Sequence, residues 1–289
     1  MQSSSTSCVS TGTRRPRRSR VNEEIEKVLN GESEGCIVCG DSLKIMAALP
    51  DGSIPMIWTD PPYGHGNQDG DLQAARVRDG VPGARRRAVK PIANDTGDAW
   101  ETAMLGFLDE ASRVLTPDCC CCCCCCMAGG GPTVLFARVA NWIDERLAFF
   151  QAIVWDKSAR GNGMGWRYRR NYEFVMVAHR KGGKLLWADP SIAVPNIVRD
   201  APVANTLHPT TKPVALVERF LRLHSRPGDI VLDPFCGSGT TCVAAKQLGR
   251  KYIGIDIDEG YCDIAKDRLL QLDGKRLGKL HKHPGFFDE

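Results

Sequence analysis

Strand, turn and helix follow one another in the stretch Ile230-Val231-Leu232-Asp233-Pro234-Phe235-Cys236-Gly237-Ser238-Gly239-Thr240-Thr241. Its apolar start is typical of a buried strand, and its glycines are typical of a turn in which the backbone approaches a ligand. Residues 242–248 continue as a helix that Gly249 ends. Lys251–Ile257 predicts the next strand, with Asp256 near its end. The sequence therefore predicts a βαβ unit with a nucleotide-type site, in which Asp256 can bind ribose hydroxyls.

A second motif, Asp60-Pro61-Pro62-Tyr63, follows the apolar residues 54–59, which also predict a buried strand. A carboxylate at the carboxyl end of such a strand lies where open α/β sheets bind ligands. The two prolines fix the backbone and remove two N–H donors. The Asp60 carboxylate and the Pro61 carbonyl remain as two acceptors near an aromatic ring. Such a site suits a planar group that carries an NH2, and it indicates chemistry on the amine of a nucleobase.

Together, the two motifs resemble those of the S-adenosylmethionine-dependent DNA methyltransferases that modify adenine N6 or cytosine N4. The catalytic motif precedes the cofactor motif, which is similar to the β-type order of that family. The resemblance covers residues 35–63 and 150–270. It implies an α/β fold, a doubly wound and mostly parallel Rossmann-like sheet with permuted motif order, and it implies S-adenosylmethionine as the cofactor.

Further segments match the family and carry over its site residues. Asp41, which follows the strand-like residues 36–39, would lie near the cofactor adenine. The segment His208–Pro213 would border the methionine end of the cofactor. Residues 155–157 and 172–173 resemble a weaker motif near the target-base pocket. The resemblance assigns catalysis to Asp60, Pro61, Pro62 and Tyr63, and cofactor binding to Asp41, His208, Thr210, Lys212, Asp233, Phe235, Gly237, Ser238, Gly239, Thr240 and Asp256.

The Asp form of the catalytic motif resembles the adenine enzymes, since cytosine-N4 enzymes more often carry Ser there. We expect adenine N6 as the target, with cytosine N4 as the alternative. Asp60 and the Pro61 carbonyl would accept the two amine hydrogens and localise the lone pair of the nitrogen, while Tyr63 stacks on the base. The base must be flipped out, because its amine is inaccessible inside a duplex. RNA methylation and a noncatalytic DNA-binding role stay open, and protein-glutamine methylation is less favoured because its motif usually follows the cofactor motif.

The chain divides into a basic tail at 1–21, a methyltransferase domain at 22–275 and a second basic tail at 276–289. The first helix is predicted at 22–29, with Asn22 as its cap. Residues 1–20 carry five arginines and no acid, which is typical of a disordered segment that can contact DNA phosphates without reading sequence. A solvated leader with no specific role is an equally good interpretation.

Two glycine-rich segments of the domain combine flexibility with positive charge. Residues 64–98 leave the catalytic motif directly, and residues 158–206 would form a small recognition region. Arginine interleaved with Trp and Tyr supplies phosphate contacts and stacking surfaces together. Solvated loops whose aromatic residues pack on the core are the alternative. The predicted DNA contacts are Arg85, Arg86, Arg87, Arg160, Arg167, Arg169 and Arg170.

Eight of the 14 cysteines form one run, Cys119 to Cys126. Neighbouring residues on a strand point to opposite faces of a sheet, so such a run cannot close one tetrahedral metal site. Cysteine behaves as a small buried hydrophobe. We expect a central strand that is buried on both faces, and no metal. A cysteine-rich metal-binding module is the alternative.

The composition agrees with one large α/β domain, because 43% of the 289 residues are hydrophobic and can supply a sizeable core. The sequence has no apolar run long enough to cross a membrane and no apolar signal segment, which predicts a cytoplasmic protein without a membrane partner. The expected partner is double-stranded DNA. A homodimer and a cognate restriction endonuclease stay open, and solitary, restriction-modification and phage-borne roles fit equally.

Overall fold

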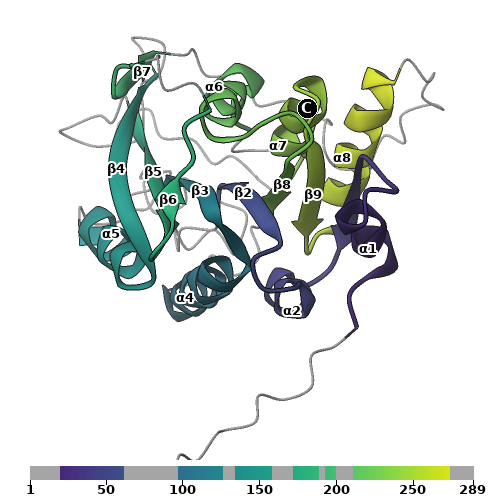
Figure 1. Ribbon diagram of the computed structural model, residues 1–289, viewed down its shortest axis with the longest axis horizontal. Coiled ribbons are helices and arrows are strands. Elements are labelled where there is room, and N and C mark those ends of the chain that lie inside the picture. The colour runs from purple at the N-terminus through teal and green to yellow at the C-terminus, as the bar shows by residue number, and fades with distance from the viewer. Residues whose placement is uncertain are drawn as a thin grey trace, which may run out of the picture.

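The structure, a computed structural model, describes residues 20–61, 97–125, 134–157, 172–188, 193–199 and 211–273 (Figure 1). The helices in these ranges are α1 (Glu23–Leu29), α2 (Ser42–Ala48), α4 (Gly97–Val114), α5 (Val134–Arg146), α6 (Val214–His224), α7 (Thr240–Gln247) and α8 (Glu259–Leu272). The strands are β1 (Gly35–Cys39), β2 (Ile54–Thr59), β3 (Leu115–Cys125), β4 (Leu147–Asp156), β5 (Tyr172–Arg180), β6 (Lys184–Leu185), β7 (Ile197–Arg199), β8 (Ile230–Asp233) and β9 (Lys251–Asp256).

These strands form one sheet in the order β1-β9-β8-β2-β3-β5-β4-β7, and β6 pairs with β3 beside this path. Within the described strands, every pairing is parallel except the two that β5 makes, with β3 and with β4. Parallel neighbours need crossover connections, which place helices on the faces of a sheet. The predicted doubly wound, mostly parallel α/β fold is therefore confirmed.

Helices cover both faces of this sheet (Figure 1). Buried side chains of α1, α2, α4 and α5 pack in one hydrophobic cluster, and those of α6, α7 and α8 pack in the other. Strand β2 supplies both, because Ile57 lies in the first cluster while Met56 and Trp58 lie in the second. This alternation places β2 at the centre of the molecule, with apolar packing on both of its faces.

The cysteine run lies in the middle of the sheet, as the sequence predicts. Strand β3 pairs with β2 on one side and with β5 on the other. Cys119 and Cys120 are both fully buried, and they belong to opposite hydrophobic clusters. These two thiols therefore fill space on the two faces of the sheet. The described residues contain no group of three or more Cys, His, Asp or Glu side chains placed to hold a metal ion.

The helix and strand boundaries follow the sequence pattern closely. Helix α1 begins after Asn22, whose side chain accepts a hydrogen bond of 2.9 Å from the backbone N–H of Glu24, and the predicted cap is confirmed. Helix α4 begins at Gly97, so the loop predicted at 64–98 ends at least two residues earlier than expected. None of the helices in the described ranges is long and apolar enough to span a membrane.

Some sequence expectations concern residues outside the described part of the chain. The proposed tails at 1–21 and 276–289 lie there almost entirely, as does the segment 64–96. The proposed recognition region at 158–206 is described only in part. Within it, β5 and β7 are strands of the main sheet, because β5 joins β3 to β4 and β7 pairs with β4. A recognition function of this region stays a prediction.

Candidate active site

Four acidic residues meet at one edge of the sheet. Strands β1, β9, β8 and β2 are neighbours and run parallel, so their carboxyl ends reach the same edge. Asp41 lies two residues beyond β1, Asp256 ends β9, Asp233 ends β8, and Asp60 follows β2. This is the edge at which open α/β sheets bind their ligands. The fold thus gathers residues that lie far apart in the sequence.

Asp233 joins the catalytic strand to the glycine turn. Its Oδ1 accepts hydrogen bonds from the hydroxyl of Thr59 at 2.9 Å and from the backbone N–H of Phe235 at 3.1 Å. Its Oδ2 accepts from the hydroxyl of Thr241 at 2.5 Å. Only 3% of Asp233 is exposed. Thr59, the residue before Asp60, is therefore linked through Asp233 to the first turn of α7.

Burial governs the ionisation of this carboxyl group. The loss of water raises the pKa of Asp233 to about 7, although hydrogen bonds from Thr241, Thr59 and Phe235 act in the opposite direction. A group that is buried so completely and held by three donors orders its surroundings. In this geometry Asp233 links the elements that would bind the cofactor. Its own predicted contact with the cofactor stays a prediction.

The glycine turn itself requires glycine at one position. Gly239 caps α7 with φ of 78°, in the left-handed region that side chains disfavour. A Cβ at this position would lie 2.7 Å from the Cβ of Ala265 on α8. The turn can therefore approach α8 closely only because Gly239 has no side chain.

Backbone N–H groups orient Asp256, the predicted ribose acid. Its Oδ2 accepts from the N–H of Gly237 at 2.8 Å, and its Oδ1 accepts from the N–H of Asp258 at 2.9 Å. Carboxylates held by backbone donors keep one orientation before any ligand arrives. The turn and the acid are thus built as one unit.

A helix residue that the sequence analysis did not single out fixes the rest of the turn. Arg268 of α8 donates to the carbonyl oxygen of Ser238 at 2.5 Å, to the Ser238 hydroxyl at 3.2 Å and to the Thr240 hydroxyl at 3.3 Å. Ser238 and Thr240 are both buried. Their hydroxyls therefore contribute to the internal structure of the turn.

Asp41 lies beside the same unit. Its carboxylate caps α2 by accepting from the N–H of Leu43 at 3.0 Å, and the N–H of Gly40 donates to the carbonyl oxygen of Asp256 at 2.8 Å. The buried hydroxyl of Ser42 donates to the carbonyl oxygen of Pro234 at 2.6 Å. The segment after β1 is therefore tied both to β9 and to the glycine turn.

Phe235 connects the turn to the opposite face of the sheet. Its ring meets the ring of Phe107 on α4 edge-on, with 5.8 Å between the ring centroids. It is partly buried and packs against the first hydrophobic cluster. Phe235 therefore anchors the turn, and cofactor contact through its remaining surface stays a prediction.

Asp60 lies in a chain of ion pairs. The ammonium group of Lys212 contacts Asp60 Oδ2 and lies 3.7 Å from Glu173 Oε2. Glu173 Oε1 contacts the ammonium group of Lys157. Lys212 and Glu173 are buried. Lys212, which the resemblance places at the methionine end of the cofactor, thus contacts the carboxylate that is predicted to be catalytic.

Pro61 is the one remaining predicted residue that the structure describes, and it is buried. The others lie outside the described part of the chain. They are Pro62, Tyr63, His208, Thr210, Arg85, Arg86, Arg87, Arg160, Arg167, Arg169 and Arg170. Their functional assignments stay predictions.

Sequence reasoning gave no role to Thr59, Thr241 or Arg268, and it placed Glu173 only near the base pocket. One signal was available for Glu173, because it is a lone acid in the otherwise apolar start of β5. Charged residues are rarely buried unless they are paired. Thr59 gave no such signal, since threonine is common in strands.

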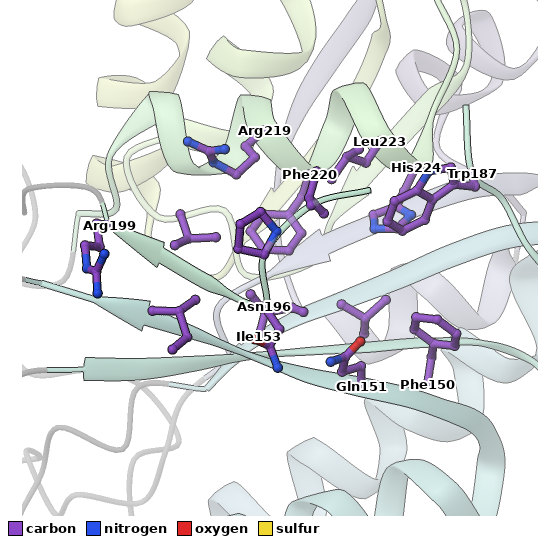
Figure 2. A pocket seen from close by; sticks show the side chains of 15 residues that line it. Phe150, Gln151, Ile153, Trp187, Asn196, Arg199, Arg219, Phe220, Leu223 and His224 are labelled. Carbon is purple, nitrogen blue, oxygen red and sulfur yellow. The ribbon is translucent and has the colours of Figure 1, made fainter. Parts of the chain in front are cut away.

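A separate cavity of about 390 Å³ lies between α6 and the strands β4 and β7 (Figure 2). Phe220 and Arg219 of α6 face Ile153 of β4 and Arg199 of β7 across it. Of the predicted site residues that the structure describes, none lines this cavity. The catalytic and cofactor assignments therefore rest on the sheet edge alone.

A family model for DNA methylases matches residues 54–267, which is more than half of the chain. The chain belongs to this family of N6- and N4-methyltransferases. The match begins at β2, the strand that Asp60 follows, and ends inside α8, the helix that packs against the glycine turn. The family resemblance is thereby confirmed.

Two curated relatives show how far the similarity extends. YubD of Escherichia coli (strain K12), which is named a methylase, is 30% identical over 230 residues, or 80% of this chain and 88% of YubD. The type II methyltransferase M2.DpnII of Streptococcus pneumoniae is 55% identical over 62 residues, or 22% of this chain and 23% of that protein. The methylase therefore resembles YubD along most of its length.

Solved structures share the fold. The crystal structure of the M1.HpyAVI-SAM complex superimposes with a TM-score of 0.58 at 26% identity, over 81% of this chain and 98% of that chain. The cytosine-N4-specific PvuII DNA methyltransferase gives a TM-score of 0.60 at 21% identity, over 82% of this chain and 87% of that chain. Because the identity to the PvuII enzyme is only 21%, this similarity supports the fold of the methylase and nothing more.

Proposed function

We propose that this DNA methylase transfers the methyl group of S-adenosylmethionine to the exocyclic N6 of an adenine that is flipped out of DNA. One observation carries the proposal. The catalytic Asp60 is held next to the cofactor turn, because its neighbour Thr59 is hydrogen-bonded to Asp233 and Asp233 is bonded to Thr241 of α7. A cofactor bound at the turn and a base bound at Asp60 would therefore lie side by side, as a transfer between two bound molecules requires.

The residues at the sheet edge fit S-adenosylmethionine chemically. Asp256 offers carboxylate oxygens for ribose hydroxyls, in an orientation set by the N–H groups of Gly237 and Asp258. Asp41 lies beside it, at the end that would face the adenine ring. The bound cofactor supplies an activated methyl group on a sulfonium. The protein's own task is therefore to hold the two reactants in line.

The target amine is a poor nucleophile, because its lone pair is delocalised into the ring. Asp60 and the Pro61 carbonyl would accept its two hydrogens and favour tetrahedral geometry at the nitrogen. Preorganised acceptors also stabilise the positive charge that grows there. Tyr63 would stack on the flipped base, and the arginines at 85–87 and 160–170 would hold the DNA backbone.

The Asp in the motif at position 60 supports adenine over cytosine as the target base. Nucleoside mass spectrometry tests this choice directly. Unmethylated DNA is incubated with S-adenosylmethionine and either the wild-type protein or Asp60→Ala, and is then digested to nucleosides. We expect N6-methyladenine from the wild type alone.

Other outcomes of this experiment have distinct meanings. N4-methylcytosine would keep the mechanism and overturn the assignment of the base. No methylated base on duplex DNA, single strands or RNA, together with measured cofactor binding, would contradict the proposed reaction.

A further inference from the structure

The Asp60 carboxylate and three other charged side chains form a row that alternates in sign. The order of contacts is Lys157, Glu173, Lys212 and Asp60. They come from four separate places in the fold: the end of β4, the start of β5, the residues before α6, and the end of β2. Among the described residues, these two cations and two anions add up to no net charge.

This group is shielded from water. The exposed fractions of the four side chains are 18% for Lys157, 3% for Glu173, 7% for Lys212 and 18% for Asp60. Charges in such surroundings act on each other more strongly than charges at the surface do. A change of one charge in this group therefore changes the potential at the Asp60 carboxylate.

The balance of these charges bears on the proposed reaction. Positive charge grows on the target nitrogen as it is methylated, until the nitrogen releases a proton. A lysine that contacts Asp60 works against that charge and occupies one of the two acceptor oxygens. Glu173 is the second anion within 4 Å of the same ammonium group, at 3.7 Å. Glu173 is therefore an alternative ion-pair partner that the Lys212 ammonium group can reach with a small movement.

We propose that Glu173 is a positioning residue that takes Lys212 away from Asp60 when the target amine enters, and that it cancels the positive charge that would otherwise oppose methylation. This inference rests on the proposed function and adds a role for a residue that touches neither base nor cofactor. In this proposal the Lys212 contact with Asp60 precedes entry of the amine, and Lys212 shifts to Glu173 when the amine takes over the carboxylate.

Lys157 sets the strength of this effect. Its ammonium group contacts Glu173 and lies 5.0 Å from the centroid of the Trp155 ring, which is buried beside it on β4. Trp155 is paired in register with Glu173 across β4 and β5. Lys157 thus competes with Lys212 for the Glu173 carboxylate. Only part of the negative charge of Glu173 is therefore available to Lys212.

Variants of Glu173 and Lys157 should have opposite effects. Glu173→Gln leaves a net positive charge beside Asp60, and we expect the single-turnover rate of methyl transfer to fall about tenfold. Lys157→Gln leaves a net negative charge, so the rate should equal or exceed that of the wild type. The double variant restores neutrality and should recover most of the loss. In all three, KM for S-adenosylmethionine should change less than kcat.

Glu110→Gln is the control, because Glu110 is a partly buried acid that is paired with a cation, Arg113, away from the site. It should leave the rate unchanged. Thermal unfolding of each variant shows whether it is folded under assay conditions.

Equal losses in Glu173→Gln and Lys157→Gln, or no recovery in the double variant, would mean that Glu173 only supports the structure, and the inference would be overturned. A normal rate in Glu173→Gln would overturn it as well. All of these outcomes are interpreted relative to a wild-type protein that is active. A wild type that methylates no base would instead refute the proposed function.

Discussion

The two halves of the sheet hold their acidic side chains by different means. In the cofactor half, made of β1, β9, β8, α7 and α8, Asp233 and Asp256 accept hydrogen bonds from backbone N–H groups and threonine hydroxyls. In the substrate half, made of β3, β5, β4 and β7, Glu173 is bound by the ammonium groups of lysines. Asp60 follows β2, which lies between the halves. It is linked to the cofactor half through Thr59 and Asp233, and to the ion pairs of the substrate half through Lys212.

This difference separates a rigid site from an adjustable one. A backbone N–H cannot move without the chain around it, whereas a lysine has four rotatable carbon–carbon bonds and loses or changes a partner easily. We therefore expect the cofactor half to keep the same geometry when its ligand binds. The substrate half can exchange ion partners when DNA and the target base arrive.

The largest effect should come from the residue at the boundary. Asp60→Ala removes an acceptor needed only during methyl transfer, so kcat should fall by about 10²–10³. The dissociation constant for S-adenosylmethionine, measured by calorimetry, should change by less than about threefold, because uniform binding is untouched. A variant that binds cofactor poorly would show that Asp60 belongs to the rigid half instead.

Asp233→Ala tests the rigid half itself. It leaves the hydroxyls of Thr59 and Thr241 and the N–H of Phe235 without their acceptor, and we expect a loss of about 3 kcal/mol in the free energy of unfolding. Cofactor binding and kcat should both suffer, in contrast to Asp60→Ala. Unfolding by urea measures the loss, and a stable variant with intact cofactor binding would contradict the role of Asp233.

The pH dependence of this loss has a defined sign. The pKa of Asp233 is about 7 in the folded protein, above its ordinary value of 3.8. The folded state therefore binds the proton more tightly, and this contribution to stability is complete below pH 4 and disappears as the pH rises to about 7. The stability difference between wild type and Asp233→Ala should shrink from pH 5 to pH 7.5. A stability difference that grows from pH 5 to pH 7.5 would contradict a raised pKa of Asp233 in the folded protein.

Gly254→Ala should show how tightly the rigid half is packed. A Cβ on this β9 residue would lie 2.6 Å from Ile37 Cδ1 and 2.7 Å from Cys242 Sγ. Overpacking of this kind costs about 2 kcal/mol, measured by unfolding. Gly106→Ala on α4 is the control, because its new methyl would mainly meet one end of the flexible Leu43 side chain and helices favour alanine. Equal losses in both variants would remove the contrast.

The smallest effect is expected in the cysteine strand. Cys120 is fully buried among apolar side chains. Cys120→Val keeps a small hydrophobic side chain there and should change the free energy of unfolding by less than about 1.5 kcal/mol, with no change in kcat. A larger loss of activity would indicate a chemical role for the thiol.

The sequence predicted the sheet edge well because the information there is local. A strand that ends in an acid and a glycine turn that opens a helix are written in consecutive residues, at Ile230–Thr241 and again around Asp60. The cysteine strand was predictable for the same reason, since a continuous run of small apolar residues suits a strand with two buried faces.

The contacts that hold the site together were not predictable, because they join distant residues. Thr59 and Asp233 are 174 positions apart, and Lys212 and Asp60 are 152 positions apart. Nothing in the sequence near Arg268 indicates that it would bind the turn at Ser238 and Thr240. The sequence thus indicated the candidate reacting groups, and the structure showed the contacts that hold them.

The strand order also determines when the protein can acquire its shape during synthesis. Strand β1 is made early, yet among the described strands it pairs only with β9, which is made last. Strands β2, β3, β5 and β4 can associate while the ribosome is still producing the rest. The first strand must wait for the final one, so a nascent chain released before residue 251 would expose β1 and could not close the cofactor site.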